Sequence, residues 1–445
     1  MSKHLIVIGG GAAGIFCAVN AARMNPGLRV TVLEKSGKLL SKVRVSGGGR
    51  CNVTHACFDI AEMAKRYPRG QHFVRKAFHR WFTTDTIAWF RERGVELKTE
   101  EDGRMFPVTD SSQTIIDCLM REVNANGVEV WMHTEVKGVA RGDGAAVGLA
   151  GDASVEGTPG DGEGLRGPTV VMAGGAEPGP ARFKVRLADG RALIADYVCV
   201  ACGGYPKSGM FDWIRELGHG IEEPVPSLFT FNMPGDPIVG LMGVSMPVVQ
   251  VKVAGSKLVE KGPVLITHWG LSGPGVLRLS AWGARELSER GYSFDIQVNW
   301  IDMTEAAARE RLQDMRQERA GQAVANRNPF GAPQRLWEFW LGLAGIGPAV
   351  RWADLPAREM NRLVGLLCAG GFAVRGKTTF KEEFVTAGGV RLSEVEAASF
   401  ESRKVPGLYF AGEILDVDGV TGGFNFQHAW TSGYVVAASV AGAAG

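Results

Sequence analysis

The sequence predicts an α/β protein in which both chain ends form one layer around a parallel sheet and the middle forms inserted units. Three observations predict this. A strand–helix–strand pattern fills the first 35 residues, and a strand, a glycine-rich loop and a helix end the chain. Between them, residues 225–369 change first to β-rich and then to helix-rich composition. Alternating strands and helices are typical of a parallel sheet covered by helices.

The N-terminal part begins with the strand–helix–strand unit. Residues 4–8 form an apolar run that ends in glycines, which is typical of a buried parallel strand. Residues 12–24 have helical composition, and residues 28–33 read as the next strand. Residues 73–93 have the spacing of one amphipathic helix, with these apolar side chains on one face: Phe73, Ala77, Trp81 and Phe82.

Strands are expected to follow on both sides of a low-complexity segment. Two or three of them are predicted between 128 and 140. Residues 142–180 then contain 12 glycines, few large apolar residues and no period. We expect this segment to be a flexible hairpin excursion. The strand signal resumes over 182–201, with a hairpin turn at Ala188-Asp-Gly190.

The middle of the chain reads as something inserted into the layered domain. Proline and glycine punctuate residues 225–300, and the β-rich runs between them suit a small antiparallel barrel. Residues 303–320 and 333–369 are helix-rich. The chain then returns to a strand at 407–411 and ends in a helix predicted over 426–441.

Composition excludes several classes of protein. Of the 445 residues, 45% are hydrophobic and 22% are charged, which is ordinary for a globular chain. The net charge of +2 does not indicate a dedicated nucleic-acid domain. No run of 18 apolar residues exists, so no membrane-spanning segment is expected. The seven scattered cysteines are typical of a reducing compartment, and we expect a cytoplasmic protein.

Glycine is used at about twice the ordinary level, with 61 residues, and one cluster carries a motif. Gly9, Gly11 and Gly14 form G-x-G-x-x-G between the first strand and the first helix, and Glu34 ends the second strand. The glycines allow a tight turn, close approach of a pyrophosphate and close helix–sheet packing. Glu34 is suited to accept hydrogen bonds from both ribose hydroxyls. The motif predicts dinucleotide binding and leaves FAD and NAD open.

Four further stretches of sequence narrow the choice between FAD and NAD. They are Ser46-Gly-Gly-Gly-Arg-Cys-Asn52, Thr267-His-Trp-Gly-Leu-Ser-Gly-Pro274, Thr386-Ala-Gly-Gly-Val390 and the glycine-rich run from Gly412 to Asn425. Together they resemble the YhiN/BaiN-like family of FAD-dependent oxidoreductases, from residue 4 to about residue 440. The resemblance implies a Rossmann-like FAD-binding domain formed by both chain ends, with an inserted small β-barrel and a helical subdomain.

The resemblance and the composition together predict domain boundaries. We expect the FAD-binding domain at 1–205 and 386–445, the barrel at 206–302 and 370–385, and the helical subdomain at 303–369. One stretch departs from the family: after Gly204 the chain has a shorter run than its relatives. The substrate of another member therefore does not carry over to this chain.

The resemblance also implies which residues hold FAD, with NAD(P)H as a transient electron donor. The first glycines and Glu34 are expected at the pyrophosphate and the adenosine ribose, the loop 46–52 at the flavin, and the C-terminal segment at the ribityl chain and flavin. The implied cofactor-binding residues are Gly9, Gly11, Ala12, Ala13, Gly14, Glu34, Lys35, Ser46, Gly47, Gly48, Gly49, Arg50, Asn52, Val136, Gly203, Gly204, Gly412, Glu413, Gly422, Gly423, Phe424 and Asn425.

Reduction at carbon by a flavin also needs a proton donor opposite the hydride. The candidates are Cys51, His268, Tyr205 and His428, and Cys51 is preferred because it lies in the loop expected at the flavin. The alternative for Cys51 is a small buried packing residue, and the alternative for His268 is a structural hydrogen bond. A hydrolase is excluded because Pro274 replaces the last glycine of G-x-S-x-G. No histidine or cysteine pair has zinc spacing.

Three functions remain open. The preferred one is reduction of an activated C=C bond in a small-molecule substrate. The second is formation of dihydrouridine in ribosomal RNA, because residues 62–80 interleave basic and aromatic side chains. The same stretch also fits the solvated face of an amphipathic helix. The third is a non-catalytic flavin-binding sensor. The sequence determines neither the substrate, nor NADH against NADPH, nor the oligomeric state.

Overall fold

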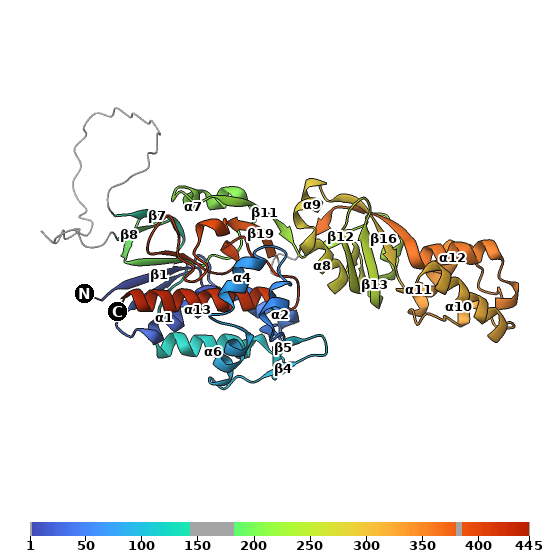
Figure 1. Ribbon diagram of the computed structural model, residues 1–445, viewed down its shortest axis with the longest axis horizontal. Helices are drawn as coiled ribbons and strands as arrows, with labels where there is room; N and C mark the ends of the chain where they lie inside the picture. Colours follow the sequence, from blue (N-terminus) through green and yellow to red (C-terminus); the bar gives the residue numbers. More distant parts are fainter. Residues whose placement is uncertain (1, 143–181, 380–384, 445) are drawn as a thin grey trace, which may run out of the picture.

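The computed structural model describes residues 2–142, 182–379 and 385–444. Apart from Gly142, the segment expected to be a flexible excursion lies outside these residues. The molecule is elongated, with a layered α/β domain at one end, a barrel in the middle and a group of helices at the other end (Figure 1).

The layered domain is built around a five-stranded sheet. Its order is β20-β10-β1-β2-β6, and every neighbouring pair is parallel. The strands are β1 (His4–Ile8), β2 (Arg29–Leu33), β6 (Glu129–Trp131), β10 (Tyr197–Val200) and β20 (Leu408–Phe410). Because β20 pairs with β10 beside the central β1, strands from both chain ends share one sheet. The predicted fold class is confirmed.

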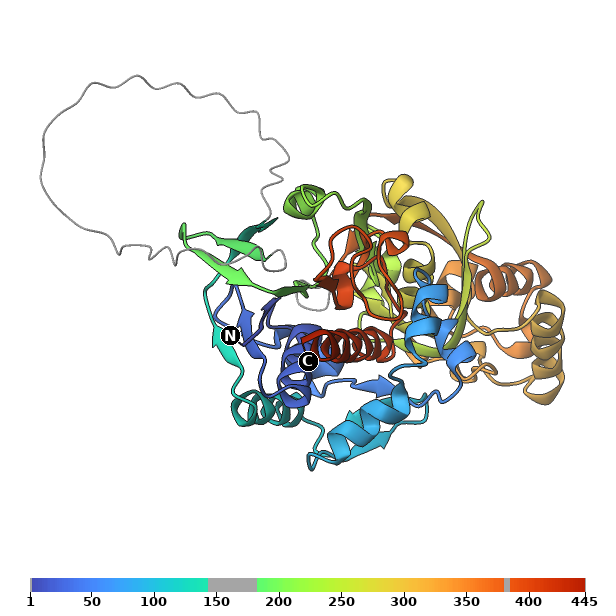
Figure 2. The ribbon, with the colours of Figure 1, turned by 60° about the vertical axis from the view of Figure 1, so that its left-hand side comes forward.

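Helix α1 (Ala12–Met24) lies against the long C-terminal helix α13 (Phe424–Ala444), as Figures 1 and 2 both show. A Cβ on Gly433 would lie 2.6 Å from the Ala13 carbonyl oxygen, so glycine is what lets the two backbones approach. Phe16 and Trp430 pack across the same contact, with ring centroids 5.2 Å apart. The N-terminal fingerprint helix and the last helix are therefore one packed unit.

A small antiparallel sheet borders this domain. It contains β7 (Val136–Arg141), β8 (Phe183–Leu187) and β9 (Ala192–Ala195). The predicted hairpin turn between β8 and β9 is confirmed. β7 and β8 also pair, and the Gly142 N–H donates to the Arg182 carbonyl at 2.6 Å. The two described ends of the glycine-rich segment thus lie next to each other.

The single helix predicted over 73–93 is wrong. The structure has two helices there, α4 (Gln71–Ala77) and α5 (Thr83–Arg91). The Asp85 carboxylate accepts a hydrogen bond from the Phe82 N–H at 2.7 Å, which caps a new helix start. The predicted apolar face is nevertheless buried. The remaining elements of this part are α2 (Ser41–Gly49), β3 (Thr54–His55), α3 (Ile60–Ala64), β4 (Leu97–Thr99), β5 (Arg104–Pro107) and α6 (Ser112–Ala125).

The β-rich middle closes into a barrel. Its sheet has the order β17-β16-β13-β14-β15-β12-β18. β17 pairs with β16 at one edge and β18 pairs with β12 at the other, and only Gly376 separates β17 from β18 in the chain. One continuous strand therefore joins both edges. The elements are β12 (Thr230–Asn232), β13 (Ser245–Val253), β14 (Val259–Thr267), β15 (Gly270–Ser272), α8 (Pro274–Trp282), α9 (Ala284–Glu289), β16 (Ser293–Asn299), β17 (Gly370–Arg375) and β18 (Lys377–Thr378).

The helices inserted in the barrel are α10 (Glu305–Glu318), α11 (Gln334–Ala344) and α12 (Ala357–Ala369). Together with the barrel they share one hydrophobic core, in which Trp300, Trp337 and Trp352 are fully buried. A second core lies under the layered domain. The domain boundaries drawn from the sequence stay predictions.

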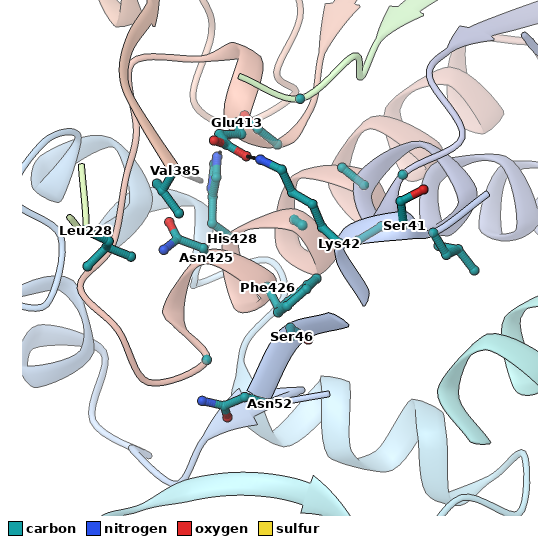
Figure 3. Close-up of a pocket in the computed structure, with 18 of the residues that line it drawn as sticks. Ser41, Lys42, Ser46, Asn52, Leu228, Val385, Glu413, Asn425, Phe426 and His428 are labelled. Carbon is teal, nitrogen blue, oxygen red and sulfur yellow. Dashed lines mark hydrogen bonds and ion pairs between the residues drawn. The ribbon is translucent and has the colours of Figure 1, made fainter. Parts of the chain in front are cut away.

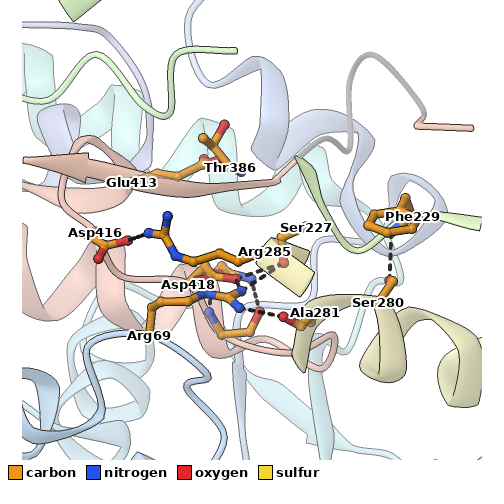
Figure 4. Close-up of polar contacts among 12 residues, drawn as sticks. Arg69, Ser227, Phe229, Ser280, Ala281, Arg285, Thr386, Glu413, Asp416 and Asp418 are labelled. Carbon is orange, nitrogen blue, oxygen red and sulfur yellow. Dashed lines mark hydrogen bonds and ion pairs between the residues drawn. The ribbon is translucent and has the colours of Figure 1, made fainter. Parts of the chain in front are cut away.

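Two strands and an ion-pair cluster join the layered domain to the barrel. β11 (Ile221–Ser227) leads into the barrel, β19 (Val385–Val390) leads out of it, and the two pair antiparallel. Beside them Arg69 forms a two-pronged ion pair with Asp418, and both contact Ser227 (Figure 4). Arg69 also donates to the Ala281 carbonyl of α8 at 2.6 Å. Asp418 is fully buried, so this cluster ties four chain segments together at a largely buried position.

Two features, a membrane-spanning helix and a cluster of metal ligands, are absent from the described residues. None of their helices is long and apolar enough to cross a membrane. No group of three or more histidine, cysteine, aspartate and glutamate side chains within them is placed to hold a metal ion.

Candidate functional site

One cavity of about 690 Å³ runs between the layered domain and the barrel. Its volume is within the range of ordinary ligand pockets, roughly 300–1,000 Å³. The glycine-rich turns of both chain ends line it, together with α2, the loop before α13 and the barrel residues around Leu228. Figure 3 shows Leu228 and Val385 on the same side of this lining as Asn425, away from Ser41.

The first glycine turn forms one wall of the cavity. Gly9 has φ +112°, and a Cβ there would lie 2.4 Å from the Ala201 carbonyl oxygen, so only glycine fits. Gly11 caps α1 without a side-chain hydrogen bond, and a Cβ on it would meet no atom within 4 Å. The first N–H groups of α1, at Ala12 and Ala13, therefore belong to residues that line open space. This wall is suited to an anionic group.

Glu34 also lines the cavity, at the end of β2. Its Oε2 accepts from the Gly10 N–H at 2.8 Å, and its Oε1 accepts from the N–H and hydroxyl of Ser36. These contacts hold the carboxylate at the cavity wall. A carboxylate oxygen has two lone-pair directions, so Oε2 retains one direction to accept from a ligand, whereas Oε1 already accepts two hydrogen bonds. Lys35 and Lys38 line the same part of the cavity.

The C-terminal segment also lines the cavity and starts beside the first glycine turn, since a Cβ on Gly412 would lie 2.9 Å from the Ala13 Cβ. Glu413 lines the cavity and pairs with Lys42 of α2, with Nζ and Oε2 2.5 Å apart (Figure 3). Asn425 shapes the loop before α13, because its side chain exchanges two hydrogen bonds with the Gly419 backbone. Oriented to satisfy its neighbours, the Asn52 amide accepts from the Gly423 N–H at 2.9 Å. The Gly423 N–H, in the segment expected at the flavin, is thus used within the protein.

The loop 46–52 forms a further part of the lining. Ser46, Gly47, Gly48 and Asn52 line the cavity. A Cβ on Gly48 would meet nothing within 4 Å, so at this point the main chain itself faces the open space.

Most of the predicted cofactor-binding residues line this one cavity, and six do not. Gly14 is a packing residue, because its Cβ would lie 2.0 Å from the Gly9 carbonyl oxygen. Arg50 pairs with Glu100 and lies over the Phe106 ring. The other four outside the lining are Gly49, Val136, Gly204 and Phe424.

The two preferred proton donors are not in the cavity lining. Cys51 is fully buried, and burial raises the pKa of its thiol to about 12, so the structure gives it a packing role. His268 is exposed in the turn between β14 and β15, against Trp269. His428 does line the cavity, and burial lowers its pKa to about 4, so its ring is neutral at pH 7. Burial raises the pKa of Tyr205.

The barrel residues that line the cavity were not predicted from the sequence. Leu228, Thr230, Ser272, Leu277 and Thr378 all line it. Ser272 lies inside a motif that was recognised, but nothing in the local pattern shows that its side chain faces the cavity. The missed residues of the layered domain include Ser41, Lys42, Arg104 and Thr421.

The residues present fit FAD, the cofactor that the sequence resemblance implies. A Cβ on Gly11, Gly48 or Gly203 would project into space that holds no protein atom, and all three line the cavity. An uncapped helix start and the Glu34 carboxylate line the same cavity, and these are the groups that the G-x-G-x-x-G motif offers to a pyrophosphate and a ribose. Residues of the barrel line the same cavity.

Comparisons with known proteins agree with this arrangement. A family model described as "HI0933-like protein Rossmann domain" matches residues 3–180, and one described as "HI0933-like protein barrel and H2TH domain" matches residues 225–385. The chain is 29% identical to a ribosomal RNA dihydrouridine synthase of Escherichia coli, over 97% of this chain and 96% of that protein. It is 28% identical to the enzyme of that name from Haemophilus influenzae and 26% identical to a 3-dehydro-bile acid delta(4,6)-reductase of Clostridium scindens, each over 98% of both chains.

Proposed function

The chain belongs to the HI0933-like family of FAD-dependent oxidoreductases, and from this premise we propose that it reduces a C=C bond conjugated to a carbonyl group in a small-molecule substrate. The proposed electron donor is NAD(P)H. In the overall reaction the substrate gains a hydride at one carbon and a proton at the other, and NAD(P)H is oxidised to NAD(P)⁺. The chemistry that bound FAD supplies is hydride transfer from N5.

The observation that carries this proposal is the continuity of the cavity. The residues proposed to hold FAD and the barrel residues Leu228, Ser272 and Leu277 line the same space. A substrate held against the barrel would therefore reach the flavin-proximal loop 46–52 without crossing solvent. The two leucines supply apolar surface for the carbon skeleton, and the hydroxyls of the same wall supply polar contacts. The relatives support the reaction class, because both named activities act on a C=C bond conjugated to a carbonyl.

The roles proposed for the chain follow from the geometry. The Ala12 and Ala13 end of α1 binds the pyrophosphate, and Glu34 accepts from the adenosine ribose. The ion pair between Lys42 and Glu413 ties α2 to the C-terminal segment, and so fixes the width of the cavity at this point. The Arg69–Asp418 pair fixes the loop before α13 against the barrel, which keeps the two parts of the cavity in register.

Anaerobic half-reactions test this proposal. NADH and NADPH are mixed separately with the FAD-loaded protein, and bleaching of the flavin absorbance gives the reduction rate. The reduced protein is then mixed with conjugated carbonyl compounds, and reoxidation together with loss of the double bond is expected. A flavin that no conjugated carbonyl compound reoxidises would contradict the proposal.

A second candidate substrate is uridine in ribosomal RNA. It is favoured by the two relatives with that name and by exposed cations at Arg66, Arg75, Lys76 and Arg80. The aromatic residues interleaved with them (Tyr67, Phe73 and Phe78) are buried, so they do not stack on bases. The surface therefore supports phosphate contacts only.

A dihydrouridine map of ribosomal RNA separates the two substrates. If RNA is the substrate, a strain lacking the gene loses a dihydrouridine, and the gene restores it. If the map is unchanged, the small-molecule proposal stands alone.

A further inference from the structure

Three hydroxyl groups form a row across the barrel wall of the cavity. Thr230 of β12 lies opposite Thr378 of β18. On its other side β12 pairs with β15 through Phe231 opposite Leu271, and continuing this register by one residue places Thr230 opposite Ser272. Directly paired residues of antiparallel strands point to the same face, with Cβ atoms about 5 Å apart. All three residues line the cavity.

Ser272 differs from its two neighbours in the row. The Thr230 hydroxyl donates to the Thr378 carbonyl at 3.0 Å, and the Thr378 hydroxyl donates to the Asn232 side chain at 3.0 Å. Both threonine hydroxyls therefore already donate their protons to acceptors within the protein. Ser272 is 9% exposed, and in the described part of the chain its hydroxyl has no hydrogen-bond partner. Its oxygen is not one of the fully buried side-chain atoms that lack a partner, so the hydroxyl is accessible and free to bond a ligand or water in the cavity.

Ser272 belongs to the barrel part of the cavity lining. Ser227, next to the lining residue Leu228, bonds Asp418 at 2.8 Å, so the barrel wall adjoins the loop that leads to Gly422 and Asn425. The residues proposed to hold the pyrophosphate belong to another part of the lining, at α1. Ser272 therefore lies in the barrel part of the lining, where the proposed function places the substrate.

We propose that Ser272 is a specificity-determining residue that donates a hydrogen bond to the carbonyl oxygen conjugated to the double bond being reduced. This inference rests on the proposed function. Charge moves from the double bond toward that oxygen during hydride addition, so a donor there both selects conjugated carbonyl compounds and stabilises the developing charge. A compound without the carbonyl leaves the hydroxyl unpaired and binds more weakly.

Ligand binding to the oxidised, FAD-loaded protein tests the inference without turnover. The probes are cyclohex-2-enone, 4-androstene-3,17-dione and uridine, with cyclohexene as the probe that lacks a carbonyl. Perturbation of the flavin absorbance gives each dissociation constant. The variants are Ser272→Ala and Ser272→Thr. Ser245→Ala is the matched control, because Ser245 is exposed in β13, two strands away in the same sheet, and does not line the cavity.

For the carbonyl probe that binds wild type most tightly, Ser272→Ala should raise the dissociation constant about three- to tenfold, the worth of one hydrogen bond. The dissociation constants of this carbonyl probe for Ser272→Thr and Ser245→Ala should stay within about twofold of wild type. The dissociation constant of cyclohexene for Ser272→Ala should do the same. Should Ser272→Ala fail to hold FAD, Ser272→Cys keeps the volume with a weak donor, and the same weakening is expected.

The outcomes separate the inference from the proposed function. If a carbonyl probe reoxidises the reduced wild type and binds Ser272→Ala as tightly as wild type, the inference is overturned and the proposed function stands. If no carbonyl probe binds or reoxidises the wild type, the proposed function fails and the inference fails with it.

Discussion

Replacing Gly11 with valine should weaken FAD binding and leave the fold intact. Gly11 has φ −83° and ψ −172°, a conformation open to any residue, and a Cβ there meets no atom within 4 Å. The cost to folding is therefore limited to the helix cap, about 1 kcal/mol. The new side chain would occupy space proposed for the pyrophosphate. Forcing extra atoms into a packed contact costs about 1–3 kcal/mol, which is roughly a tenfold to hundredfold rise in the dissociation constant.

The assay is a titration of the apo-protein with FAD, followed by quenching of flavin fluorescence, alongside thermal unfolding without FAD. Gly240→Val is the matched control, because a Cβ on Gly240 also meets no atom within 4 Å and Gly240 does not line the cavity. Wild-type FAD affinity in Gly11→Val would refute the placement of the pyrophosphate. An apo-protein that no longer folds would refute the geometry of the turn.

Of three further predictions, two concern the free energy of unfolding and one concerns FAD content. Asp418→Asn should lower the free energy of unfolding in urea by about 3 kcal/mol, because Arg69 then loses its partner at a buried junction, and a loss below about 1 kcal/mol would contradict this. Burial lowers the pKa of His219 to about 4, so its contribution to stability is complete above about pH 6.5 and is lost as the pH falls toward 4. His219→Asn should therefore flatten the dependence of the free energy of unfolding on pH in this range. An unchanged slope in the variant would contradict this prediction. Replacing residues 143–181 with Asn-Gly should leave FAD content unchanged, because Gly142 and Arg182 already lie at hydrogen-bond distance, whereas loss of FAD would mean the segment is required.

The chain ends could be predicted because their signals are local. The apolar run before Gly9 and the spacing to Glu34 define one strand–helix–strand unit, and the structure has β1, α1 and β2 there. The two-helix structure of 73–93 was missed because its cause is a single cap by Asp85 inside an otherwise helical pattern.

The cavity could be predicted only in part, because burial and strand register depend on distant residues. Cys51 follows a glycine loop that reaches the cavity, yet its own side chain turns into the core at φ +63°. The row of Thr230, Ser272 and Thr378 joins positions far apart in the chain, and only the closed barrel brings them together.

The position of FAD is the central claim, and a crystal structure of the reconstituted protein, with its flavin content measured by absorbance, tests it most directly. We expect one FAD per chain, with the pyrophosphate at the start of α1 and the flavin between the loop 46–52 and the start of α13, facing Ser272. A protein that binds no FAD, or that binds it outside this cavity, would contradict the account.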